Sequence, residues 1–149
     1  MNEKIRTVVS SESEVAGLRE NIKLHLEASQ KIEVIGFSTT EIAAIRQQIV
    51  RKKPDFLLVD HPLFHSENLP ELIGFIRKVK KHTPNTEIII RGPKLVDDET
   101  KRLLEAGVFA YINEQVSNEL LGPAIETILQ KGSIANPMVT IAPREVDWL

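Results

Sequence analysis

The sequence predicts an α/β fold: a five-stranded parallel sheet, doubly wound, in three α/β/α layers. Within about 130 residues, five short runs rich in Val and Ile alternate with five amphipathic stretches. The runs are apolar on successive residues, as in strands that are covered on both faces. Right-handed crossovers between such strands place helices on both sides of the sheet.

The predicted strands are short and end beside polar residues. They span Ile5–Ser10, Ile32–Phe37, Phe56–Val59, Ile88–Ile90 and Val108–Ile112. In doubly wound sheets, functional groups gather at the carboxyl ends of the strands. The segments to inspect are therefore Ser10–Ser13, Phe37–Thr40, Asp60–Phe64, Arg91–Lys94 and Asn113–Val116.

The helices have recognisable starts and stops. The first is predicted from about Ser13 to Ala28, and the second follows a capping box of Ser38 and Glu41 and ends before Pro54. The third begins at Asn68, the fourth runs from Asp97 or Asp98 to Gly107, and the fifth runs from Ser117 or Pro123 to Lys131. Because proline inside a helix costs about 3 kcal/mol, Pro123 predicts a kink or a late start.

Composition narrows the function. The 149 residues suit one domain with a short tail, and the absence of cysteine excludes disulfides and thiolate chemistry. A net charge of -2 argues against a domain that grips nucleic acid alone, so the basic run at 77–82 is interpreted as a solvated helix face. No apolar run is long enough for a signal peptide or a membrane span, which predicts a cytoplasmic protein with no membrane partner.

Four segments resemble the receiver domains of LuxR/NarL/FixJ-type response regulators. They are PDFLLVD at 54–60, LEA at 26–28 with IEVIG at 32–36, LEAGVFAYI at 104–112, and IAPREVDWL at 141–149, which is similar to the opening of a LuxR-type helix-turn-helix domain. The resemblance implies a (βα)5, CheY-like (flavodoxin-like) receiver at 1–132, a linker at 133–140 and the truncated start of a DNA-binding domain at 141–149. DNA would then be bound only through the missing remainder of that domain.

The resemblance also implies a phosphorylation site, and this chain departs from it at most positions. Asp60 takes the phosphoacceptor position and Tyr111 that of the switch aromatic, while Ser11 and Glu12 replace the acidic pair that holds Mg²⁺. Gly92 replaces the switch hydroxyl, Glu114 replaces the lysine, and Phe64 replaces a proline. Glu12 and Asp60 remain as possible Mg²⁺ ligands; no other cofactor is expected.

These departures predict that the phospho-switch is lost. A carboxylate at Glu114 would repel a phosphoryl group, and one charge pair at 4 Å is worth roughly 4 kcal/mol at an effective dielectric near 20. Arg91 or Lys94 could instead neutralise Asp60 permanently, because an unpaired buried carboxylate is costly. The alternative is that both cations are ordinary surface residues.

The leading hypothesis is a non-enzymatic, phosphorylation-independent regulatory module. It would control the dimerisation and output of a LuxR-type transcription factor, through a homodimer, a histidine kinase or other regulatory protein, or a small ligand. One alternative is a conventional receiver phosphorylated on Asp60 by a histidine kinase. Another is a flavodoxin-like cofactor-binding protein, although the loop at 10–14 has no glycine to cradle a phosphate. His61 and His65 are weak evidence for a transition-metal site.

Overall fold

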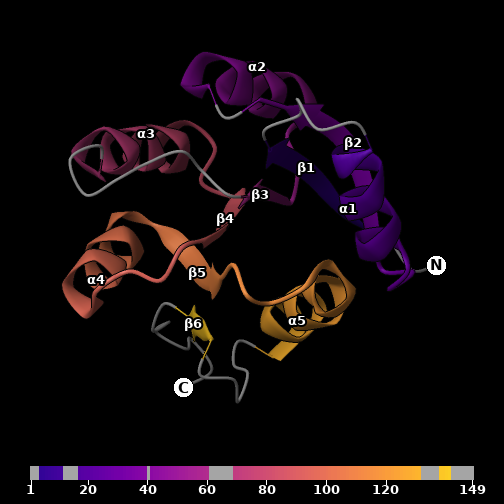
Figure 1. The fold of residues 1–149 in the computed structure, drawn as a ribbon. Helices are drawn as coiled ribbons and strands as arrows, with labels where there is room; N and C mark the ends of the chain where they lie inside the picture. Colours follow the sequence, from indigo (N-terminus) through magenta and orange to yellow (C-terminus); the bar gives the residue numbers. More distant parts are fainter. Residues whose placement is uncertain (1–3, 12–16, 40, 61–68, 132–137, 142–149) are drawn as a thin grey trace, which may run out of the picture.

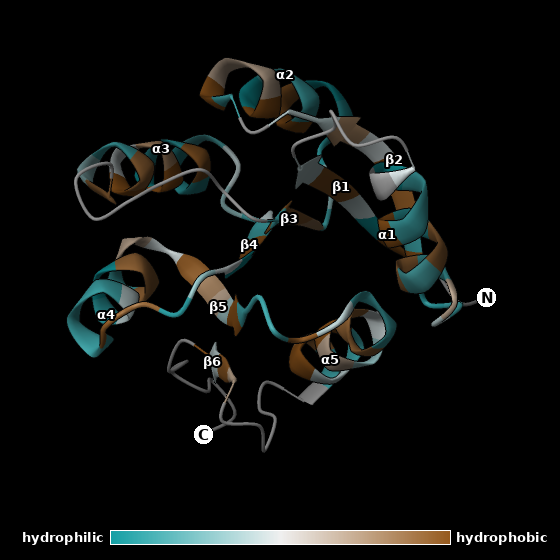
Figure 2. Cartoon of the chain, in the orientation of Figure 1, coloured by the Kyte–Doolittle hydropathy of each residue, from teal (hydrophilic) through white to brown (hydrophobic). Residues whose placement is uncertain are grey.

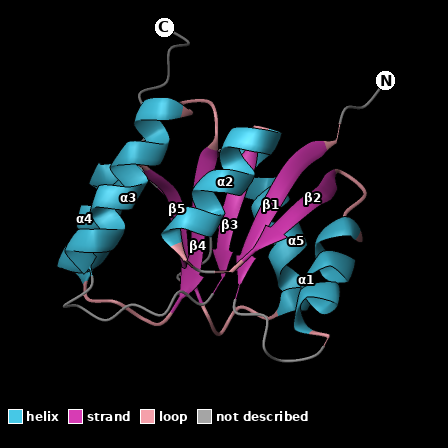
Figure 3. Ribbon diagram, turned by 90° about the horizontal axis from the view of Figure 1, so that it is seen from above, coloured by secondary structure: helices cyan, strands magenta, loops and turns pink. Residues whose placement is uncertain are grey.

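The central feature of the fold is a single twisted sheet. The computed structural model describes residues 4–11, 17–39, 41–60, 69–131 and 138–141. Its strands are β1 (Ile5–Ser11), β2 (Ile32–Ser38), β3 (Phe56–Asp60), β4 (Glu87–Gly92), β5 (Val108–Asn113) and β6 (Val139–Ile141). They lie in the order β2-β1-β3-β4-β5-β6, and β1 to β5 are parallel (Figures 1 and 3). The predicted α/β class and parallel core are therefore confirmed.

The sixth strand corrects the predicted count of five. β6 pairs antiparallel with β5 and places Thr140 opposite Tyr111. The Asn113 N–H also donates to the Met138 carbonyl at 2.8 Å, just beyond the paired residues. Residues 139 and 140 were expected in a linker, but here they extend the sheet. The reason is that β5 would otherwise leave a row of unpaired backbone groups at the sheet edge.

The five helices connect successive strands, as predicted. They are α1 (Leu18–Glu27), α2 (Ile42–Lys52), α3 (Leu69–His82), α4 (Asp97–Ala106) and α5 (Asn118–Lys131). The predicted capping box of α2 is wrong, because Ser38 ends β2 and its hydroxyl donates to the Thr39 carbonyl. Of the two predicted starts of α5, Ser117 is confirmed to within one residue and Pro123 is wrong, since the helix begins at Asn118 and contains Pro123.

Two apolar cores fill the space between the sheet and its helices. Helices α2, α3 and α4 cover one face, and α1 and α5 cover the other (Figure 1). Successive residues of β3 serve the two cores in turn: Leu57 and Val59 pack under α2–α4, whereas Phe56 and Leu58 pack under α1 and α5. Hydrophobic residues accordingly line the sheet, and hydrophilic residues, drawn in teal, lie on the outward side of α4 (Figure 2). Among the described helices, none combines the length and apolar character needed to cross a membrane.

Side chains protect the opposite edge of the sheet, at β2. The Glu27 carboxylate accepts a hydrogen bond from the Val34 N–H at 3.1 Å. The Lys52 ammonium donates to the Ile35 carbonyl at 2.5 Å, at the point where the β1–β2 register shifts by one residue. Both edges of the sheet are thus partly covered, one by charged side chains and the other by β6.

Helices α1 and α5 approach each other closely at Gly122. A Cβ atom on Gly122 would lie 2.9 Å from the His25 carbonyl oxygen, a contact that only backbone movement could relieve. Gly122 is a poor helix former by intrinsic propensity. Its place in α5 is explained by this packing contact.

Candidate functional site

The carboxyl ends of three neighbouring strands bring Ser11, Asp60 and Arg91 into one row. In the sheet register, Ser11 of β1 is opposite Asp60 of β3, and Asp60 is opposite Arg91 of β4. Residues opposite each other in parallel strands project to the same face. Leu58 and Ile89, two residues earlier in β3 and β4, lie in the core under α1 and α5. Asp60 and Arg91 therefore project from the α1/α5 face.

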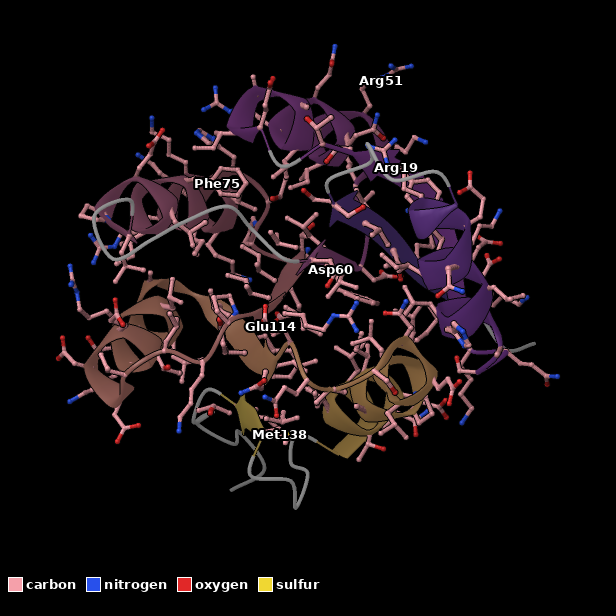
Figure 4. The ribbon with its side chains drawn as sticks, in the orientation of Figure 1. Arg19, Arg51, Asp60, Phe75, Glu114 and Met138 are labelled. Carbon is pink, nitrogen blue, oxygen red and sulfur yellow. The ribbon has the colours of Figure 1, made fainter. Side chains whose placement is uncertain are left out.

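Arg91 and Asp60 form a buried bidentate ion pair. Arg91 Nε donates to Asp60 Oδ1 at 2.5 Å, and Arg91 Nη2 donates to Asp60 Oδ2 at 2.9 Å. Asp60 is 1% exposed and Arg91 3% exposed. The fork of the guanidinium thus occupies both oxygens of the carboxylate, the geometry in which such pairs are strongest. Figure 4 shows Asp60 between the two helical layers.

The other donors of Arg91 reach the start of α5. Nη1 donates to the Val116 carbonyl at 3.0 Å, and Nη2 donates to Asn118 Oδ1 at 2.6 Å. The Asn118 amide in turn donates to Asn21 Oδ1 on α1 at 2.7 Å. One side chain therefore connects the end of β3 to both helices of this face. Val116 falls in a strand-end segment that the sequence singles out, but its role could not be predicted, and neither could those of Asn118 and Asn21, because they depend on how the β5–α5 loop folds over the sheet.

The remaining predicted positions lie around this pair. Ser11 is buried, and its hydroxyl has no hydrogen-bond partner among the described residues. Gly92 is buried, and its carbonyl accepts the Glu114 N–H at 2.8 Å. Glu114 itself is exposed, at the turn that follows β5. Lys94 is also exposed, and of the two candidate cations it is Arg91 that binds Asp60.

Tyr111 is buried in the other core, under α4. Its hydroxyl donates a short hydrogen bond to the Pro93 carbonyl, in the segment that joins β4 to α4. Burial raises the pKa of the phenol far above its usual value, and the negative charges of Glu114 and Glu99 raise it further. The phenol thus stays neutral in the folded protein, and its hydrogen bond connects the start of the β4–α4 segment to β5.

The chain has sequence relatives among known response regulators. No protein-family model matches the chain. The response regulator protein VraR of Staphylococcus saprophyticus is 25% identical over 127 residues, which are 85% of this chain and 58% of that protein. VraR of Staphylococcus aureus matches with the same identity and coverage. The chain therefore spans about 58% of the length of the curated relatives that it matches.

Solved receiver structures superpose on most of the chain. The signal receiver domain of NarL from Mycobacterium tuberculosis matches with a TM-score of 0.69 and 18% identity, over 87% of this chain and 98% of that one. The non-phosphorylated receiver domain of RcsB from Escherichia coli gives 0.70 and 17%, over 88% and 96%. The chain has the receiver fold, and response regulators are among its homologues. Asp60 is the last residue of β3.

The described residues at this site do not suit Mg²⁺. Both Asp60 oxygens are bound by a guanidinium, which a divalent cation would have to displace, and Ser11 offers a hydroxyl where an acidic ligand is expected. No group of three or more His, Asp or Glu side chains in the described part of the chain could hold a metal ion. Glu12, His61, Phe64 and His65 lie outside the described residues.

Proposed function

We propose that this chain is a regulatory receiver module that works without phosphorylation of Asp60. The observation that carries the proposal is the bidentate Arg91–Asp60 pair. A carboxylate must present a free oxygen in order to attack a phosphoryl group, and Arg91 occupies both oxygens of Asp60. The pair is nearly inaccessible to solvent, so water does not readily replace the guanidinium.

The energy of the pair supports the same conclusion. Removing one partner from a buried, hydrogen-bonded ion pair typically costs about 3–5 kcal/mol. Phosphorylation would have to release Arg91 from Asp60 or accommodate it in a new position, and no hydroxyl at Gly92 or lysine at Glu114 is present to bind the phosphoryl group afterwards. Arg91 thus places a permanent positive charge beside the Asp60 carboxylate.

The homologues support a proposal for the output that such a module controls. VraR is a response regulator, and a solved Salmonella typhimurium RcsB structure, 20% identical over 92% of this chain, is described in terms of DNA interaction. We propose that this receiver lacks catalytic activity and controls dimerisation and a LuxR-type DNA-binding domain. It would do so through a protein partner or a small ligand instead of a phosphoryl group.

An amide NMR titration with Mg²⁺ and beryllofluoride, which mimics an aspartyl phosphate, tests the proposal. The isolated RcsB receiver of Salmonella enterica, solved with the same phosphomimetic, serves as the positive control. We expect the amide spectrum of this chain to stay unchanged. Shifts that reach α5 and disappear in Asp60→Asn would show that the acceptor still works, and the proposal would be wrong.

A further inference from the structure

We propose that a groove between α2 and α3 binds an acidic amphipathic helix of a partner protein. The floor of this α2–α3 groove is apolar and consists of Ile49, Val50, Phe75 and Val79. Its rim is basic and carries Arg46, Lys78 and His82. Phe75 lies on the side of α3 that faces α2, whereas Arg51, at the end of α2, points outward (Figure 4).

The residues that line the groove recur along each helix with helical spacing, so the groove runs along both helices. On α3, Phe75, Lys78, Val79 and His82 stand at positions i, i+3, i+4 and i+7, so they share one face. The hollow between the helices has a volume of about 60 Å³. This is the space of about two water molecules. It therefore suits the end of one aliphatic side chain that projects from a larger partner, and it is too small for a separate ligand.

The floor is partly open to solvent. Val50 is 57% exposed, although it lies beside Ile49 and Phe75, which are buried. A helix that placed an aliphatic side chain here would cover Val50 and extend the core outward.

The charges around the groove select an acidic partner. α2 contains no Asp or Glu, and the single one of α3, Glu71, lies in the first turn. Arg46, Lys78 and His82 form no ion pair with any residue that the structure describes. The whole chain has a net charge of -2, so this positive charge is local. Carboxylates on a docking helix would pair with Arg46 and Lys78 at the rim.

The apolar floor distinguishes a protein partner from a nucleic acid. Contacts to a nucleic acid backbone need cations and hydrogen-bond donors, whereas a row of aliphatic side chains contributes little to them. The groove also lies on the face of the sheet opposite the Arg91–Asp60 pair, so its role does not depend on how Asp60 is used.

A labelled model peptide provides the test. The probe is a synthetic amphipathic helix with Leu along one face and Glu along the other, and the control peptide carries Gln in place of every Glu. Binding to the full chain is followed by fluorescence anisotropy, and the site is located by amide NMR. We expect shifts confined to α2 and α3 and no binding of the Gln peptide.

Four variants localise the binding. Lys78→Glu and Arg46→Glu should each weaken the peptide by about tenfold or more, because a rim attraction becomes a repulsion. Lys23→Glu makes the same charge change on α1, beyond the sheet, and should leave affinity within about twofold because exposed pairs contribute little. Val50→Ser should weaken binding without changing the charge. Absence of binding, equal losses in all variants, or tighter binding of duplex DNA with the same sensitivity to Lys78→Glu would each overturn the proposal.

Discussion

Replacing Arg91 by methionine tests the structural basis of the proposed function. The substitution keeps an unbranched, though shorter, side chain and removes the four hydrogen bonds that reach Asp60, Val116 and Asn118. The buried carboxylate of Asp60 then loses its charged partner, which costs about 3–5 kcal/mol. The Val116 carbonyl loses a donor as well, for which a further 1–3 kcal/mol is the usual range for a buried group. Because these effects are not additive, we expect a total loss of about 4 kcal/mol.

Urea unfolding followed by circular dichroism measures this loss directly. The double variant Asp60→Leu/Arg91→Met replaces both partners by apolar groups and should recover most of the lost stability, since the desolvation of two charges is also removed. Lys101→Met is the matched control: its side chain is 75% exposed and 3.9 Å from Glu105, so it should cost about 0.5 kcal/mol or less. A loss below about 1 kcal/mol for Arg91→Met, or a double variant no more stable than the single one, would contradict the role assigned to the pair.

Three further predictions follow from other parts of the fold. Gly122→Ala should destabilise the protein by about 1–3 kcal/mol in thermal unfolding, because its Cβ would lie 2.9 Å from the His25 carbonyl oxygen; a neutral or stabilising effect would refute the close contact. The chain has a single tyrosine, so the rise in absorbance near 295 nm that accompanies tyrosinate formation reports Tyr111 alone. Burial raises the pKa of the Tyr111 phenol, so the folded state favours the neutral form. The contribution of this preference to folding stability is complete below the pKa of tyrosine in the unfolded chain, about 10, and is lost as the pH rises above it. Tyrosinate should therefore appear together with unfolding and not before it. Deleting residues 138–149 should accelerate hydrogen exchange at the Asn113 amide, which donates to the Met138 carbonyl; unchanged exchange would show that β6 does not protect β5.

The strands and helices could be predicted because their signals are local. The five buried strands agree with the structure to within two residues at each end, since runs of Val and Ile identify them without knowledge of their neighbours. β6 could not be predicted in this way. Its three residues have no pattern of their own, and it forms because β5 offers an unpaired edge. The alternative start of α5 at Pro123 was wrong because the propensities of Gly122 and Pro123 were weighed without the packing of α1 against Gly122.

The contact between Asp60 and Arg91 was within reach of the sequence, but the choice between Arg91 and Lys94 was not. Both cations follow the buried run of β4, and either could approach a carboxylate at the end of β3. What separates them is the register: β4 extends to Gly92, so Arg91 is still a strand residue, directly opposite Asp60. Lys94 lies beyond the strand and is exposed. Strand ends are the least certain part of any sequence-based assignment, and here two residues decide which cation is buried.

The position of Arg91 also links the departures from the receiver pattern. Under the proposed function, the guanidinium that binds both Asp60 oxygens excludes a phosphoryl group, so a hydroxyl at position 92 or a lysine at position 114 would have no ligand to bind. The Gly92 carbonyl accepts the Glu114 N–H, and the Glu114 side chain is exposed. Arg91 meanwhile connects Asp60 to Asn118 and, through it, to Asn21 on α1. In this chain a fixed side chain therefore holds the end of β3 against the α1/α5 face, where in a phosphorylated receiver the charge at that position changes with the signal.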